Sequence, residues 1–189
     1  MTALEPRLFA FDEFVAMGQP LGHFELVDGR VYVTGPRSDR QRLVCSVIHA
    51  ALNRRIGSGG LDEQFLVVAG PTLRLSESTA VEPDLAVIDG PVRRYATEPI
   101  STQRVRLVIE VAEISLAHDL GERSRRYAAA GIPEYWVVDV KACRIHALRS
   151  PAAEGYSDAT LHRNVQLASR AAAPLAIDVA GIFASTPKV

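Results

Sequence analysis

Two acidic residues of this chain lie in or beside short apolar stretches, where an ionised side chain is costly. Asp84 follows Pro83 in the segment VEPDLAVI, and Glu110 lies inside the segment VRLVIEVA. A carboxylate kept away from water must be paired, hydrogen-bonded or coordinated to a metal ion. Each segment contains an apolar run of strand length that is rich in β-branched residues, so we expect two strands buried on both faces.

Two carboxylates held on rigid strands could share one hard cation. Mg²⁺ and Mn²⁺ prefer carboxylate, carbonyl and water oxygens, and a site with one or two carboxylates leaves positions free for water and phosphate. Asp84 and Glu110 would supply the carboxylates, and the backbone of Val111 would supply a carbonyl oxygen. The cation would lower the pKa of a bound water and stabilise charge on a phosphoryl oxygen. The chemistry that this indicates is metal-dependent hydrolysis of a phosphodiester bond.

The composition fits a single domain over residues 1–189, because a hydrophobic fraction of 48% is ordinary for a soluble globular protein. No stretch has the length of a membrane span and the N-terminus carries no secretory signal, so the expected location is cytoplasmic. The net charge of −1 neither demands nor excludes DNA as a partner. Cys45 and Cys143 lie far apart without metal-ligand spacing, which predicts buried free thiols.

The first half of the chain predicts a helix, a hairpin, a longer helix and two strands. A short helix should start near Phe11 and stop at Gly18 and Pro20, and Asp28-Gly29 between two apolar runs predicts a hairpin with a tight primed turn. Apolar residues at three- and four-residue intervals predict an amphipathic helix over 39–56. Strands are expected over 64–68 and 72–75.

The second half predicts a β-α-β unit around the candidate acids. The strand with Glu110 should lead into a helix over 119–130 that Gly131 ends, followed by the strands EYWVVDV and RIHALR. In the C-terminal region, LHRNVQLAS predicts a strand and PLAIDVAGIF a segment that packs on the core. SDAT and STPKV are expected to be a loop and a loose end.

Three segments in order, EPDLAVI, LVIEVAEIS and HDLGERSRRYAAAGIPEYWVVD, resemble the bacterial family of putative restriction endonucleases. The resemblance also includes the hairpin FELVDGRVY and the helix after it, so that it covers residues 11–149. Its most specific part is AGIPEYWVVD. The resemblance implies an α/β (α+β) fold with a mixed sheet. It is the restriction endonuclease-like PD-(D/E)XK core, here with an N-terminal helix and β-hairpin.

The resemblance also implies a catalytic set with one departure. Asp84 and Glu110 match the family's metal ligands, but Ala112 stands where the basic signature has a lysine. The family supplies that lysine from the following helix, four residues before Tyr127, where this chain has Arg123. An arginine stays charged and cannot act as a general base, although it could hold a phosphate or stabilise transition-state charge. The departure is therefore compatible with normal catalysis and with weakened catalysis.

Each of these residues also has a simpler interpretation. Asp84 could cap a loop, Glu110 could form a buried salt bridge with an arginine, and Arg123 could pair with Asp119 four residues earlier. Glu25 resembles the acid of the family's first hairpin, so it could contact the metal or support its ligands, or it could be an exposed cross-strand partner. The aromatic residues Tyr127 and Trp136 are expected to pack in the core or at an interface.

The leading hypothesis is an endonuclease that hydrolyses DNA phosphodiester bonds with Mg²⁺ or Mn²⁺. The alternative is a catalytically weak or inactive nuclease-fold protein that serves as a nucleic-acid-binding or assembly module. A hydrolase of another phosphate ester also fits, because the sequence shows no base-reading motif. By analogy with the two-fold symmetry of duplex DNA, a homodimer would suit cleavage of both strands.

Overall fold

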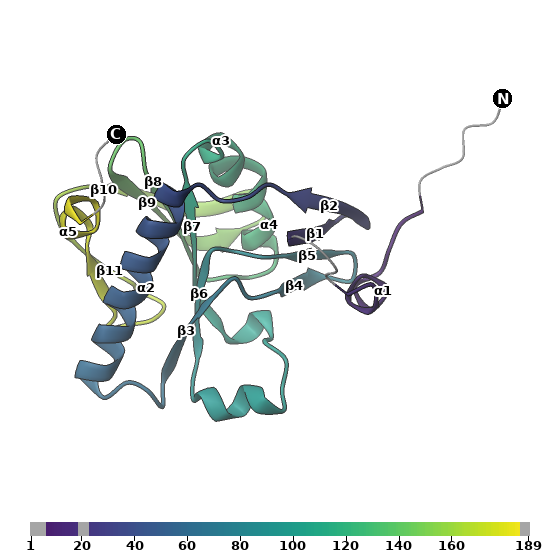
Figure 1. The fold of residues 1–189 in the computed structure, drawn as a ribbon, viewed down its shortest axis with the longest axis horizontal. Coiled ribbons are helices and arrows are strands. Elements are labelled where there is room, and N and C mark those ends of the chain that lie inside the picture. The colour runs from purple at the N-terminus through teal and green to yellow at the C-terminus, as the bar shows by residue number, and fades with distance from the viewer. Residues whose placement is uncertain (1–6, 19–22, 186–189) are drawn as a thin grey trace.

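Sheets of six, four and two strands and their helices make up residues 7–18 and 23–185, which are the residues that this computed structural model describes (Figure 1). The first elements are α1 (Phe11–Ala16), β1 (His23–Val27), β2 (Arg30–Thr34), α2 (Asp39–Gly59), β3 (Phe65–Ala69), β4 (Leu73–Ser76) and β5 (Thr79–Val81). The middle of the chain forms β6 (Leu85–Asp89), the 3₁₀ turns η1 (Val92–Ala96) and η2 (Thr102–Arg104), β7 (Val105–Ala112), α3 (Leu116–His118), the π-helical turn η3 (Asp119–Arg123) and α4 (Ser124–Ala129). The chain ends with β8 (Glu134–Asp139), β9 (Arg144–Ala152), β10 (Gly155–His162), β11 (Gln166–Ala168), β12 (Ala176–Asp178) and α5 (Val179–Ala184).

The larger sheet has six strands in the order β10-β9-β8-β7-β6-β3. Its neighbouring strands pair antiparallel except for β7 and β8, which pair parallel. A parallel pair needs a crossover, and the helical segment from α3 to α4 provides it. The predicted β-α-β unit and mixed sheet are therefore confirmed.

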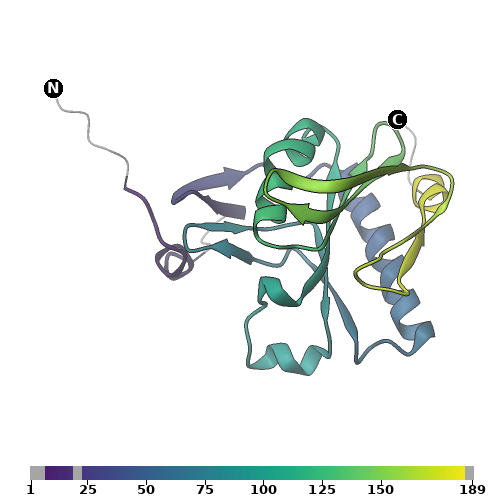
Figure 2. The ribbon, with the colours of Figure 1, turned by 180° about the vertical axis from the view of Figure 1, so that it is seen from behind.

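Strands β6 and β7 are buried on both faces, as their apolar sequences predicted. In β6, Leu85 and Val87 belong to the core that includes α2, whereas Ala86 and Ile88 belong to the core that includes Tyr127 of α4. Figures 1 and 2 show α2 on one side of the sheet and α4 on the other. Because successive side chains of a strand point to opposite faces, both faces must be apolar.

The smaller sheet, with strand order β2-β1-β5-β4, carries the predicted hairpin. Its turn residues Asp28 and Gly29 have φ angles of 51° and 78°, the left-handed conformation that a primed turn requires at both positions. Strand β5 was not predicted, because its three residues are too short to show a pattern. Since β1 pairs with β5 shortly before β6 begins, the hairpin is held beside the start of β6.

Helix α2 matches the predicted amphipathic helix and is anchored at both ends. Ser38 and Gln41 form a capping box, in which each side chain accepts a hydrogen bond from the backbone N–H of the other. Gly60, with φ of 63°, ends the helix. The residues that α2 buries recur at the expected intervals: Val44, Ile48, Leu52 and Ile56.

Several predictions about the rest of the chain were wrong or only partly right. The predicted loop SDAT lies in β10, because pairing with β9 outweighs the low strand propensity of its polar residues. The helix predicted over 119–130 begins earlier, at Leu116, and contains a π-helical turn. Cys45 is partly buried as a free thiol, but Cys143 is exposed. Two predictions fall on residues outside the described part of the chain: the helix stop at Pro20, and residues 186–189 of the expected loose C-terminal end.

None of the helices in the described residues is both long and apolar enough to cross a membrane.

The C-terminal segment is fixed to the sheet by the fully buried carboxylate of Glu134. One oxygen accepts hydrogen bonds from Trp136 Nε1 at 2.8 Å and from Arg149 Nε at 2.7 Å. The other accepts from the Ser169 hydroxyl at 2.7 Å and from the backbone N–H groups of residues 170 and 171. Five donors therefore compensate one buried charge, which makes the desolvation of this carboxylate tolerable.

We expect Glu134→Ala to lower the free energy of unfolding by about 3–5 kcal/mol, because it leaves the buried guanidinium of Arg149 without its carboxylate. Urea denaturation followed by the fluorescence of Trp136 measures the change. The control is Glu154→Ala in the exposed β9–β10 turn, which should change stability by less than about 0.5 kcal/mol. Equal midpoints for the two variants would contradict the assignment.

Candidate functional site

The residues singled out in the sequence line one cavity of about 290 Å³. It opens where the start of β6, the end of β7, β1, η3 and the segment before α2 meet. Among its lining residues are Glu25, Asp84, Glu110, Val111 and Arg123. The structure thus brings together side chains from four separate parts of the sequence.

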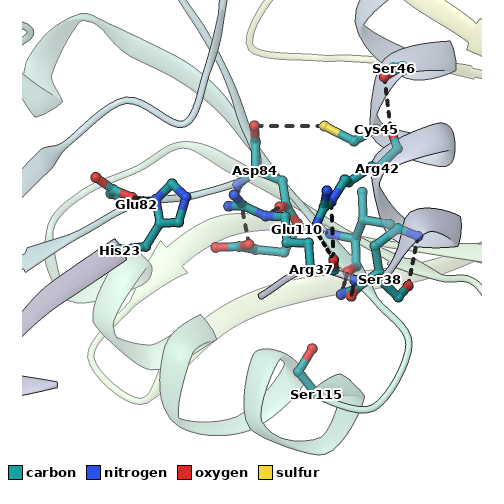
Figure 3. A network of polar contacts seen from close by, with 12 residues as sticks. His23, Arg37, Ser38, Arg42, Cys45, Ser46, Glu82, Asp84, Glu110 and Ser115 are labelled. Carbon is teal, nitrogen blue, oxygen red and sulfur yellow. Dashed lines mark hydrogen bonds and ion pairs between the residues drawn. The ribbon is translucent and has the colours of Figure 1, made fainter. Parts of the chain in front are cut away.

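Asp84 lies immediately before β6 and is only 6% exposed. Its Oδ2 accepts a hydrogen bond of 2.7 Å from the backbone N–H of Val111, which ties the start of β6 to the end of β7. Its Oδ1 forms an ion pair with the Nε of Arg37 (Figure 3). The simple loop-capping interpretation therefore does not describe Asp84, since its partners are a neighbouring strand and an arginine.

Glu110 lies in the middle of the core and points toward the α3–α4 side of the sheet. Its Oε1 accepts hydrogen bonds from Arg123 Nε at 2.6 Å and from the Tyr127 hydroxyl at 2.8 Å. Among the described residues, its Oε2 accepts only a long bond of 3.4 Å, from the backbone N–H of Asp84. The buried salt bridge that was one interpretation of Glu110 is present, and it lies inside the cavity that also holds Asp84.

Arg123 pairs with two carboxylates rather than with Asp119. Besides its bond to Glu110, it donates from Nη1 and Nη2 to the two oxygens of Glu25, at 3.0 and 2.7 Å. This two-point geometry uses the planar fork that distinguishes arginine from lysine. Burial disfavours the charge of Arg123, but the attraction of Glu110 and Glu25 outweighs burial and raises its pKa. Asp119 instead accepts a bond of 2.6 Å from Ser115.

Glu25 is buried rather than an exposed cross-strand partner, with 6% exposure. In addition to its contacts with Arg123, its Oε1 accepts a hydrogen bond of 3.0 Å from the backbone N–H of Glu82. The carboxylate therefore connects the hairpin to the segment that leads into β6. By pairing with Arg123, the Glu25 carboxylate holds the guanidinium in the place where it also contacts Glu110.

Three parts of the site were missed by the sequence analysis: Arg37, Gln41 and the Tyr127 hydroxyl. Gln41 Nε2 donates to the carbonyl oxygen of Val111 at 2.9 Å, so a capping residue of α2 also contacts β7. Tyr127 is fully buried as predicted, but its hydroxyl has a polar role that core packing alone did not indicate. Its spacing of four from Arg123 was the available signal, because such residues share a helix face.

The cavity concentrates acidic side chains. Four buried acids line it, Glu25, Asp84, Glu110 and Asp119, and the first three form ion pairs with two arginines, Arg37 and Arg123. Burial raises the pKa of Glu110 to about 8 against the opposing effect of Arg123, and the nearby charges of Asp84 and Asp119 raise it further. An additional cation in the cavity would reduce this excess of negative charge.

The oxygen atoms in the cavity suit a hard divalent cation. Glu110 Oε2 has a single long hydrogen bond, and the Val111 carbonyl has one lone pair left beside its bond from Gln41. No group of three or more His, Cys, Asp or Glu side chains in the described part of the chain is arranged to hold a metal. A cation here would therefore be held by Asp84, Glu110, a carbonyl and water, a donor set typical of Mg²⁺ and Mn²⁺.

Comparison with known proteins gives the family and the fold of the chain. A family model described as Uma2, putative restriction endonuclease, matches residues 11–180, which extends beyond the 11–149 of the resemblance. No curated protein matches the chain. Among solved structures, the crystal structure of a putative nuclease belonging to DUF820 from Anabaena variabilis ATCC 29413 is similar, with a TM-score of 0.70 and 11% identity. The match covers 94% of this chain and 98% of that one and confirms the restriction endonuclease-like fold.

We expect Arg123→Ala to lower the free energy of unfolding by about 3–5 kcal/mol, because Glu25 and Glu110 would lose the charge that compensates their burial. The matched control is Arg126→Ala, one helical turn further along. Arg126 pairs with the exposed acids Asp28 and Glu122, so its loss should cost less than about 1 kcal/mol. Chemical denaturation of both variants measures the difference, and similar losses would contradict the structural role of Arg123.

Proposed function

The chain belongs to the Uma2 family of putative restriction endonucleases, and on this premise we propose that it is a metal-dependent endonuclease that hydrolyses DNA phosphodiester bonds. The observation that carries the proposal is the meeting of Asp84 and Glu110, two buried acids from neighbouring strands, in one cavity. We also propose that it works as a homodimer, because the two-fold symmetry of a dimer matches that of duplex DNA and would suit cleavage of both strands.

Asp84, Glu110 and the carbonyl of Val111 would hold Mg²⁺ or Mn²⁺ in this proposal. When bound, the cation would supply an activated water and stabilise negative charge on the phosphoryl group. The chain's own residues contribute orientation and charge. The Val111 N–H fixes Asp84, whereas Arg123 and Tyr127 fix Glu110. Arg123 also presents a permanent positive charge to the cavity, where it would attract the phosphate.

We expect Asp84→Asn and Glu110→Gln each to abolish Mn²⁺ binding in isothermal titration calorimetry, because each removes a charged ligand at nearly constant shape. Each variant should also lose any Mn²⁺-dependent cleavage of supercoiled plasmid DNA. The control is Asp89→Asn at the opposite end of β6, whose carboxylate pairs with Arg106 outside the cavity. Mn²⁺ binding that persists undiminished in both site variants would reject the proposed site.

A second candidate function is favoured by the contacts of Arg123. Its guanidinium already makes hydrogen bonds to two carboxylates, and it cannot release a proton to act as a base. We therefore keep as an alternative a catalytically weak or inactive nuclease-fold protein that binds nucleic acid or assembles with other proteins. In that case the cavity would retain its acids for stability and charge.

Arg123→Lys distinguishes the two functions. If the natural chain is catalytically inactive, the lysine variant should gain Mn²⁺-dependent plasmid cleavage, because a lysine can be desolvated and can orient water. If the natural chain is active, it should cleave plasmid itself, and Asp84→Asn should stop the cleavage. Cleavage by the natural chain that depends on Asp84 would exclude the inactive alternative. Melting temperatures of all variants control for loss of folding.

A further inference from the structure

Arg37 and Arg123 both neutralise candidate metal ligands, but they are held to different degrees. The side chain of Arg123 is 12% exposed and contacts Glu110 and Glu25 through three hydrogen bonds. The side chain of Arg37 is 32% exposed, and in the described part of the chain its one ion pair is with Asp84. Arg123 is therefore a fixed part of the core, whereas Arg37 lies at the mouth of the cavity.

The backbone of Arg37 is held by hydrogen bonds, whereas in the described part of the chain the ion pair of its side chain is the one with Asp84. The Arg37 carbonyl accepts hydrogen bonds from Arg42 Nε at 3.1 Å and from Arg42 Nη2 at 2.8 Å. The next residue, Ser38, caps α2. The guanidinium of Arg37 can thus leave Asp84 by rotation about side-chain bonds, without any change in the elements around it.

Asp84 does not depend on Arg37 for its position. Its Oδ2 is held by the Val111 N–H in the ladder region between β6 and β7, so only Oδ1 faces the arginine. Because Oδ1 accepts no such backbone hydrogen bond among the described residues, it is the Asp84 oxygen that is available to a cation in the cavity. A divalent cation at this oxygen would compete with the guanidinium, because two positive charges close to one carboxylate oxygen repel each other.

We propose that Arg37 is an exchangeable counter-ion of Asp84, which a divalent cation displaces and which then binds a phosphate of the DNA substrate. This inference rests on the metal site proposed above. Once released, the guanidinium remains tethered at the mouth of the same cavity and requires an anion. A DNA phosphate beside the cation matches its planar fork. Metal binding would in this way prepare the cavity for its substrate.

The first test is calorimetric titration of the full chain with Mn²⁺ in the absence of DNA. Arg37→Ala should bind Mn²⁺ about five-fold more tightly than the natural chain, because the cation no longer competes with a partly exposed ion pair. The control Arg163→Ala removes the same charge from an exposed turn residue whose side chain has no ion pair among the described residues. It should leave the Mn²⁺ affinity unchanged.

The second test measures DNA binding by fluorescence anisotropy of a labelled duplex, with Ca²⁺ in place of Mn²⁺. Arg37→Ala should bind the duplex about ten-fold more weakly than the natural chain, because a charge-assisted contact to phosphate is lost. Arg163→Ala should not reproduce this loss. Tighter Mn²⁺ binding together with weaker DNA binding in one variant is a combination that a purely structural role of Arg37 would not produce.

The outcomes separate this inference from the proposed function. If neither the natural chain nor Arg37→Ala binds Mn²⁺, the metal site itself is rejected. If the natural chain binds Mn²⁺ and Arg37→Ala binds it equally or more weakly, the metal site stands and the exchange is overturned. Unchanged DNA affinity in Arg37→Ala would overturn the phosphate contact. If Arg37→Ala does not melt cooperatively, Arg37→Lys replaces it in both tests. This variant should bind Mn²⁺ more tightly and DNA more weakly than the natural chain, with smaller changes than those given for Arg37→Ala. Affinities for Mn²⁺ and DNA equal to those of the natural chain would overturn the exchange.

Discussion

The guanidinium of Arg123 connects three elements that are distant in the sequence. It joins Glu25 of β1 to Glu110 of β7, and it extends from the π-helical turn that follows β7. Taking one such charge out of water is costly, and the cost is offset here because every contact is a charge-assisted hydrogen bond. These contacts tie the smaller sheet to the larger one along one wall of the cavity.

Arg123 stands where the resemblance to the family implies a lysine. A lysine is a compact charge on a flexible stem, whereas arginine presents several donors in a rigid plane. With Arg123, one side chain contacts Oε1 of Glu110 and both oxygens of Glu25. A lysine has a single nitrogen at its end and could not reproduce this planar set of contacts.

Local patterns allowed the sequence to predict the strands of Asp84 and Glu110, the hairpin turn and helix α2, because apolar periodicity and turn chemistry depend on neighbouring residues. They also indicated that the two acids needed partners. The contact of Arg37 with Asp84 could not be predicted, since it arises only when the segment before α2 packs beside the start of β6. The polar strand β10 was missed for a similar reason: its pairing with β9, rather than its composition, makes it a strand.

The alternation of side chains along β7 limits how this cavity can change. Glu110 faces Arg123 and Tyr127 only because of its register, and adding or removing one residue earlier in the strand would turn it toward α2. The irregularity in the pairing of β6 and β7 lies between Val87 and Ile88, away from the Leu85–Ile109 pair beside the acids. For evolution or protein engineering, strand length here is a fixed quantity. New reactivity would have to come from exchanging side chains and not from insertions or deletions.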